Sequence, residues 1–213
     1  MPPTLGYLQI CQMLRAAAGK IRAHHEMLSR LDSAVGDGDH GTSMLRAMEA
    51  VEKTVGENTG TDLKPLFSAV AWAVMSSDAG STGPLLGSFF QGLSEGATGR
   101  NEFDGGGLAA LFEAGITKLQ KQGRAQIGDK TMMDAFLPAL AALQAADPAQ
   151  GIKTALLQAA TAAAQGAEAT KTMRAKFGRA RNLGDRSLGA VDPGAMSVAL
   201  LFDGFCAALP DAA

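Results

Sequence analysis

Residues 108–119 read L-A-A-L-F-E-A-G-I-T-K-L, and this stretch carries the pattern that decides the fold. Its apolar residues recur at intervals of three or four, as they do on one face of an α-helix. These residues are Leu108, Leu111, Phe112, Ile116 and Leu119. Elsewhere alanine is abundant and aromatic residues make up only 5% of the chain, so nearly every long segment has a helical rather than an alternating period. The sequence therefore predicts an all-α protein.

We expect eight helices, with ends uncertain by about two to four residues. They cover residues 5–28, 43–56, 63–77, 83–97, 105–122, 131–146, 148–173 and 193–208. Asp147-Pro148 and Asp192-Pro193 each place a side-chain acceptor ahead of a proline, a pattern typical of a helix start. Pro138 lies inside a helical pattern and should kink or shorten that helix.

Composition limits the class of protein. A chain of 213 residues with 46% hydrophobic content can bury one sizeable core, so we predict one domain over residues 1–213. Nineteen Lys and Arg against 21 Asp and Glu give a net charge of -2, which argues against nucleic acid or an acidic membrane as a partner. Cys11 and Cys206 both lie in apolar helical patterns, as expected for buried thiols in a reducing compartment. Because we find no targeting leader and no membrane-spanning run, we expect a cytoplasmic protein.

A second stretch, residues 31–43, carries the chemistry and reads L-D-S-A-V-G-D-G-D-H-G-T-S. Glycines separate three carboxylates, those of Asp32, Asp37 and Asp39, so the backbone can curl and direct several oxygens to one point. Mutual repulsion destabilises such a cluster unless a cation is bound, and Mg²⁺ with a phosphate is the usual occupant. The segment therefore predicts a site for a hard divalent cation.

A plain surface turn is the alternative, because Asp and Gly are ordinary turn formers. An EF-hand fails on spacing, since Met48 or Ser43 would occupy the place of its bidentate Glu. His40 and the residues after it lead into a helical pattern, and a helix N-terminus favours anions. His40 itself either hydrogen-bonds a phosphate or a metal-bound group, or has a structural role in the loop.

Three more glycine-rich segments also end at predicted helix starts. They are residues 78–84, 123–131 and 178–194. If these helix N-termini meet at one end of a bundle, their N–H groups and dipoles would favour a polyphosphate. The alternative is that helical hairpins simply need glycine-rich turns.

The segment 123–131 reads G-R-A-Q-I-G-D-K-T and looks like a P-loop. It is not one, because Asp129 separates the second glycine from Lys130 and the preceding segment is helical rather than a strand. Thr131 followed by Asp134 instead resembles a capping box that starts a helix.

Basic residues are concentrated shortly before Asp192, in a chain that is slightly acidic overall. They are Lys171, Arg174, Lys176, Arg179, Arg181 and Arg186. They could be a solvated helix end that complements the helix dipole. Arg179, which follows a glycine and has another five residues later, is better suited to bind a phosphate bidentately.

Four blocks taken together resemble a known family. They read L-D-S-A-V-G-D-G-D-H-G, A-G-S-T-G-P-L-L-G-S-F-F, I-G-D-K-T-M-M-D and G-R-A-R-N-L-G-D-R-S-L-G-A-V-D-P-G-A. In this order, across nearly the whole chain, they are similar to the nucleotide-binding L subunits of dihydroxyacetone kinases. The same domain forms the C-terminal part of ATP-dependent single-chain dihydroxyacetone kinases. The resemblance implies an antiparallel eight-helix barrel with the nucleotide at one end.

The resemblance also implies roles for individual residues. Asp32, Asp37 and Asp39 would hold two Mg²⁺ ions that bridge the phosphates of ADP or ATP, and Arg179 would join them as the fourth catalytic residue. The implied nucleotide contacts are His40, Gly41, Thr42, Ser43, Ser81, Thr82, Gly123, Thr131, Met132, Arg179, Asp192, Pro193 and Gly194. Many relatives differ from this chain in three places, having Asn for Ser43, Tyr for Asn182 and a Gly-Gly-Ala-Ser-Gly loop around residues 78–83.

By this resemblance the chain is a phosphoryl donor. A separate K subunit would hold the ketose, dihydroxyacetone or a related sugar such as erythrulose, as a hemiaminal on a histidine. The donor would be exchangeable ATP, or bound ADP recharged by an M subunit of the phosphoenolpyruvate-dependent phosphotransferase system. A nucleotide-sensing regulatory or scaffold protein is the rival function, since the same surface in this family can bind a transcription regulator. The sequence also leaves a homodimer open.

Overall fold

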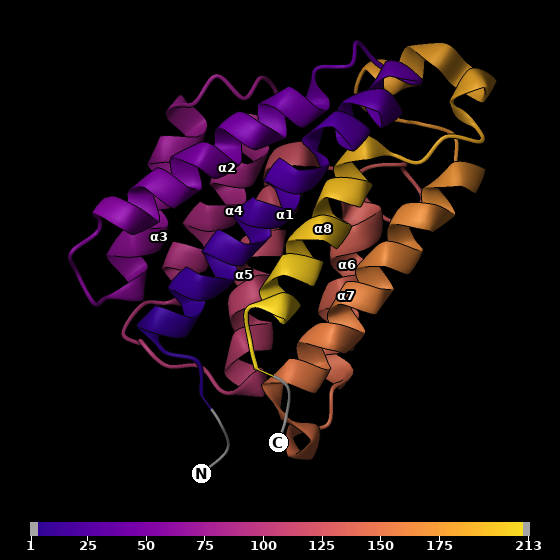
Figure 1. Ribbon diagram of the computed structural model, residues 1–213. Helices are drawn as coiled ribbons and strands as arrows, with labels where there is room; N and C mark the ends of the chain where they lie inside the picture. Colours follow the sequence, from indigo (N-terminus) through magenta and orange to yellow (C-terminus); the bar gives the residue numbers. More distant parts are fainter. Residues whose placement is uncertain (1–3, 211–213) are drawn as a thin grey trace.

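The computed structural model describes residues 4–210, and this part of the chain is helical (Figure 1). It contains α1 (Tyr7–Ser33), α2 (His40–Glu57), α3 (Leu63–Ser76), α4 (Thr82–Gly96), α5 (Gly105–Gly123), α6 (Met133–Ala145), α7 (Gly151–Ala169) and α8 (Pro193–Ala207). Three 3-10 helices accompany them: η1 (Pro148–Gln150), η2 (Thr170–Thr172) and η3 (Arg179–Ser187). Leu5 and Phe103 form an isolated bridge. The all-α prediction is confirmed.

The eight helices form a closed ring. Each packs against the next in the sequence, and α8 packs back against α1. The closure is tight, because a Cβ on Gly204 of α8 would collide with the backbone of Ala17 in α1. Successive helices run in opposite directions, so α2, α4, α6 and α8 all begin at the upper end of Figure 1. The opposite end, called the far end below, holds the starts of the odd-numbered helices.

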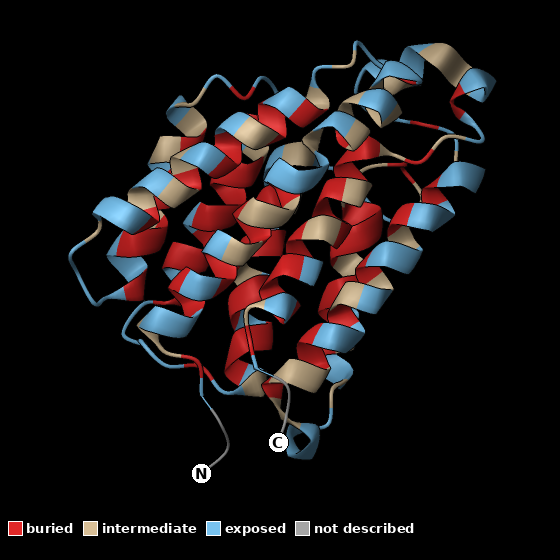
Figure 2. Ribbon diagram, viewed as in Figure 1, coloured by how far each residue is buried: buried red, intermediate tan, exposed pale blue. Residues whose placement is uncertain are grey.

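The helix faces that point to the inside of the ring carry the buried residues (Figure 2). Six phenylalanines pack in contact there, with the ring centroids of neighbouring pairs 5.2 to 6.2 Å apart. They include Phe89, Phe112, Phe136 and Phe202, and all are buried. Since aromatic side chains bury large areas, this cluster gives the helices a rigid common core.

Most predicted helix ends agree with the structure to within one or two residues, but four differ. The first helix continues past residue 28 to Ser33, because residues 29–33 contain no glycine or proline to end it. The second begins at His40 rather than residue 43. The helix predicted over 148–173 is broken, since Pro148 starts η1 and α7 covers only Gly151–Ala169. The segment 178–194 contains η3, which the prediction treated as loop.

The predicted caps form. The Asp192 carboxylate accepts a hydrogen bond of 2.7 Å from the Ala195 N–H at the start of α8. Asp147 accepts one of 2.9 Å from Ala149, but at the start of η1 rather than of an α-helix. Pro138 lies inside α6, which continues on both sides of it. Both cysteines are buried, as predicted.

Among the described helices, none combines the length and the apolar character that crossing a membrane requires.

Candidate functional site

The four glycine-rich segments meet at the end of the ring where the even-numbered helices begin. They enclose a cavity of about 600 Å³ lined by residues within 32–43, 80–85, 119–133 and 177–194. The starts of α2, α4, α6 and α8 each contribute to its wall. Helix N-termini carry free N–H groups and a partial positive charge. The cavity therefore suits an anionic ligand, as the loop pattern predicted.

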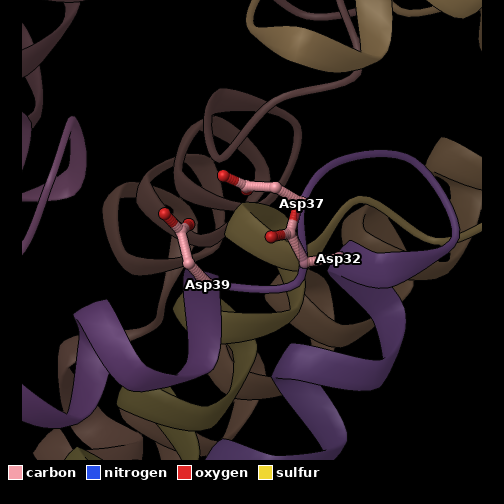
Figure 3. A group of neighbouring side chains, drawn as sticks. All are labelled: Asp32, Asp37 and Asp39. Carbon is pink, nitrogen blue, oxygen red and sulfur yellow. The ribbon is translucent and has the colours of Figure 1, made fainter.

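Three carboxylates lie together at this cavity (Figure 3). Asp32 belongs to the last turn of α1, Asp37 to the connecting loop, and Asp39 is the N-cap of α2. One oxygen from each lies within 4.8 Å of the others. Asp32 also joins the cluster to the start of α2, because its Oδ2 accepts a 3.2 Å hydrogen bond from the His40 N–H. Three converging carboxylates fit a hard divalent cation such as Mg²⁺.

Arg179 supplies positive charge to the same cluster. Its guanidinium forms an ion pair with Asp37 and lies 4.0 Å from an oxygen of Asp39. The arginine therefore occupies a position where a cation relieves the repulsion between the carboxylates. It comes from η3, so the fold brings together two motifs about 140 residues apart in the sequence.

His40 is held in a defined orientation at the cavity wall. The Ser197 hydroxyl donates to the Pro193 carbonyl at 3.0 Å, so it accepts at 2.8 Å from the His40 Nε2–H. Burial lowers the pKa of the imidazole below its usual value, although the charge of Asp32 opposes the shift. The lowered pKa favours the neutral imidazole, and the contact with Ser197 indicates Nε2 as its donor nitrogen.

Asp192 also lies on the cavity wall and has an unusual protonation equilibrium. Burial raises the pKa of its carboxyl to about 7, and the nearby charges of Asp134 and Asp32 act in the same direction. The Ala195 N–H and the Lys130 ammonium oppose the shift. Near neutral pH, Asp192 therefore exchanges between a neutral and a charged form.

The start of α6 forms the reciprocal cap that the sequence indicated. The Thr131 hydroxyl accepts a 3.2 Å hydrogen bond from the Met133 N–H, and Asp134 accepts one of 2.7 Å from the Thr131 N–H. Asp134 also accepts from the Gly128 N–H at 2.6 Å. These bonds fix the loop before α6, and with it the cavity-lining side chains of Thr131 and Met132.

Most of the predicted site residues line the cavity. They are Asp32, Asp37, Asp39, His40, Ser43, Ser81, Thr82, Gly123, Thr131, Met132, Arg179, Asp192, Pro193 and Gly194. Two do not. Gly41 packs against α1 so closely that a Cβ would collide with the His25 carbonyl, and Thr42 lines a neighbouring cavity of about 360 Å³. That smaller cavity adjoins Asp37 and Asp39 on their outer side.

Sequence reasoning missed several wall residues. Leu85, Leu119, Met133 and Phe177 give the cavity an apolar wall. Leu119 belongs to the apolar face of the helix predicted around residues 108–119. Nothing in a single sequence shows that such a face also borders a cavity. Lys130 also lines the cavity, although its position in a segment that only resembles a P-loop does not predict this.

Arg46 was missed as well. It lies one turn of helix beyond Ser43, on the wall of the smaller cavity. Its guanidinium donates to the backbone carbonyl of Asp78 at 3.0 Å and to its carboxylate at 2.9 Å. A spacing of three residues from Ser43 on a helix was the signal that could have revealed it.

Comparison with known proteins identifies the family of the chain. The DAK2 domain family matches residues 34–207. The ADP-binding subunit DhaL of the PEP-dependent dihydroxyacetone kinase 1 of Listeria innocua is 37% identical over 183 residues, which are 86% of this chain and 87% of that protein. The corresponding subunit from Escherichia coli is 33% identical over 196 residues, which are 92% and 93% of the two chains.

Longer kinases and a solved structure are also similar. The L-erythrulose 1-kinase of Mycolicibacterium smegmatis is 38% identical over 181 residues, 82% of this chain but 31% of that protein. The crystal structure of the dihydroxyacetone kinase from C. freundii in complex with AMP-PNP and Mg²⁺ superimposes with a TM-score of 0.75 at 25% identity, over 98% of this chain and 35% of that one. With these matches over nearly its whole length, the chain belongs to the DAK2 domain family, which includes the ADP-binding DhaL subunits of dihydroxyacetone kinases.

Proposed function

We propose that this chain is the phosphoryl-donor subunit of a kinase for dihydroxyacetone or a related short ketose. It binds ADP or ATP with two Mg²⁺ ions and passes the γ-phosphoryl group to a ketose held by a separate K subunit. The observation that carries the proposal is the cluster of Asp32, Asp37 and Asp39 beside Arg179, at the mouth of a cavity ringed by four helix N-termini.

In this function the three aspartates anchor the metal–phosphate end of the nucleotide. Their oxygens are the hard ligands that Mg²⁺ prefers, and Mg²⁺ would draw electron density from the β- and γ-phosphates. Asp32 is fixed by the His40 N–H, so the cluster is preorganised at the start of α2. The apolar wall, which includes Leu85 and Leu119, suits an adenine ring.

Arg179 and the helix starts stabilise negative charge as the phosphoryl group leaves. Phosphoryl transfer requires positioning and charge neutralisation more than covalent chemistry from the protein. Arg179 pairs with Asp37 and would turn to the equatorial phosphate oxygens once the metal neutralises the aspartates. N–H groups at the start of α2, where the N-cap side chain makes no capping hydrogen bond, would add hydrogen bonds to the phosphates.

The acceptor requires a second protein. The described residues offer no nucleophile placed to hold a ketose, and the cavity mouth beside Asp37 and Asp39 is exposed enough for another subunit to approach. The relatives from Listeria innocua and Escherichia coli are named as ADP-binding subunits of PEP-dependent kinases. We therefore favour bound ADP, recharged by a phosphotransferase-system protein, over freely exchanging ATP.

The proposal is tested by purifying the chain, identifying any nucleotide that remains bound, and assaying transfer to dihydroxyacetone with and without a K subunit. Erythrulose is the parallel substrate. We expect bound ADP that dissociates slowly, and transfer only when the K subunit is present. Nucleotide binding without transfer to either ketose would instead support a nucleotide-sensing role.

A further inference from the structure

A long connection between α7 and α8 carries Arg179 to the cavity. We call residues 171–189 the arginine loop. It contributes Phe177, Gly178, Arg179, Ala180 and Asn182 to the cavity wall. The loop closes on itself at its base, where the Gly189 N–H donates to the Lys171 carbonyl at 2.8 Å. The position of Arg179 therefore depends on what holds this base to the barrel.

One buried lysine contacts both ends of the loop. The Lys130 Nζ donates to the carbonyl of Thr170 at 2.6 Å and to that of Ala190 at 2.5 Å. These are the residues immediately before and after the arginine loop. Only 2% of Lys130 is exposed to solvent. A single ammonium group on the segment before α6 thus binds both ends of the 19-residue arginine loop.

The arrangement is costly, which argues that it has a purpose beyond filling space. Burial of an ammonium destabilises the folded state unless hydrogen bonds and opposite charges compensate. The backbone of Lys130 also has φ of 60°, in the left-handed region that non-glycine residues rarely adopt. Methionine or leucine would fill the same volume without the desolvation cost.

The residue before Lys130 reinforces the attachment. The Asp129 carbonyl accepts a 3.1 Å hydrogen bond from the Lys176 N–H, and its carboxylate pairs with the Lys176 ammonium at 2.7 Å. Asp129 is itself fixed, because its carboxylate accepts from the Gln126 N–H at 2.7 Å. The segment 126–130 therefore forms a platform on which the arginine loop rests.

We propose that Lys130 is a positioning residue that clasps the two ends of the arginine loop and so holds Arg179 at the three-aspartate cluster. For its effect on phosphoryl transfer this inference rests on the proposed function, but the clasp itself does not. Its loss should free the loop while the eight-helix ring remains folded.

The chain offers a matched control in Lys153. Its ammonium also donates to two backbone carbonyls, those of Cys206 at 2.8 Å and Leu209 at 2.7 Å. These lie at the end of α8, at the far end of the ring. Lys153→Met therefore removes two bonds of the same kind without touching the arginine loop.

The first experiment compares amide hydrogen exchange in the wild type, Lys130→Met and Lys153→Met. In Lys130→Met we expect exchange within residues 171–189 to be at least about tenfold faster, with α5 and α8 unchanged, since local opening is independent of global unfolding. Lys153→Met should leave that loop unchanged. Wild-type exchange in the loop of folded Lys130→Met, or an equal increase throughout the chain, would overturn the proposal. Should Lys130→Met not fold, Lys130→Gln, which keeps one N–H donor pair, is measured by the same criteria.

The second experiment asks whether Lys130 acts through Arg179. Transfer rates are measured for Lys130→Met, Arg179→Ala and the double variant. We expect both single variants to lower kcat more than they raise KM for the nucleotide, and the double variant to be no slower than Arg179→Ala alone. If the double variant instead loses activity by the product of the two single losses, Lys130 does not act through Arg179 and the proposal is overturned. If the wild type transfers nothing while the exchange result holds, the proposed function fails and the clasp survives.

Discussion

The two Asp-Pro steps of this chain cap helices at opposite ends of the ring in the same way, but their surroundings differ. Asp147 is exposed at the far end and caps a single 3-10 turn. Asp192 caps α8 at the cavity, where burial raises its pKa to about 7. The same dipeptide is thus a local structural feature at one end and part of the cavity wall at the other.

This contrast extends to the two ends as a whole. A second cavity, of about 400 Å³, lies at the far end and is lined by Asp104, Glu113 and Asp147 together with glycines at the starts of α5 and α7. The described residues place no cation in its wall, and its carboxylates do not form a close group of three. The cavity at the starts of the even-numbered helices differs from it by its three convergent carboxylates and by Arg179.

The largest expected effect comes from removing one charge of the cluster. Asp37→Asn should weaken Mg²⁺-dependent nucleotide binding by about 100-fold or more, because a metal ligand is lost. Asp37 is exposed and lies outside the helices, so the helical circular dichroism signal should not change. Calorimetric titration with ADP and Mg²⁺ provides the measurement.

Glu113→Gln, in the far-end cavity, is the control for that experiment and should bind nucleotide as the wild type does. Equal affinity of Asp37→Asn and the wild type would show that the ligand binds elsewhere.

The second effect separates binding from transfer. Arg179→Ala should lower kcat for transfer by about 100- to 1000-fold, as loss of a charge-stabilising group does, while the nucleotide Kd changes by only a few-fold. Single-turnover transfer to the ketose and equilibrium binding are measured on the same preparation. If the transfer rate and the nucleotide affinity decrease by the same factor, Arg179 only helps to bind the nucleotide.

The third effect uses the two Asp-Pro steps directly. Because the folded-state pKa of Asp192 is raised, the folded protein binds more protons than the unfolded chain between about pH 4 and 7. This contribution to stability is therefore present at low pH and is lost as pH rises to 7. In the wild type, the free energy of unfolding should therefore decrease by up to about 3 kcal/mol between pH 5 and 8. Asp192→Asn should remove this decrease, whereas Asp147→Asn should leave it unchanged. Urea unfolding of the nucleotide-free protein at both pH values gives the comparison, and identical pH profiles for the wild type and Asp192→Asn would contradict it.

The smallest effect is expected at the far end. Asp147→Ala removes the hydrogen bond to the Ala149 N–H and should lower the free energy of unfolding by about 1 kcal/mol. Nucleotide affinity should remain at its wild-type value. A change in affinity would show that the two ends are coupled through α7 and α8.

Much of the fold could be predicted because helix periodicity, caps and glycine-rich turns are local signals. The prediction was wrong where a segment lacked such signals. Residues 29–33 carry no stop, so α1 runs on and places Asp32 on a helix rather than in the loop. The basic, glycine-containing segment at 179–187 has no apolar period, yet it forms η3, which is held by the ion pair of Arg179 with Asp37 and the hydrogen bond from the Ala175 N–H to the Ser187 hydroxyl.

The candidate site could be predicted only in part, for a related reason. The aspartates and glycines can be recognised from the sequence because they are closely spaced in one loop. Leu85 and Leu119 reach the same cavity from different helices, and their positions in the sequence look like ordinary core positions. The role of Lys130 depends on two carbonyls 40 and 60 residues away, which no motif encodes.

Both ends of the described chain lie at the far end of the ring, away from the cavity (Figure 1). A further domain joined to either one would leave the entrance of the cavity unobstructed. This arrangement is compatible with a separate subunit, as in the Escherichia coli relative, and with a domain that forms about 35% of a longer chain, as in the C. freundii kinase.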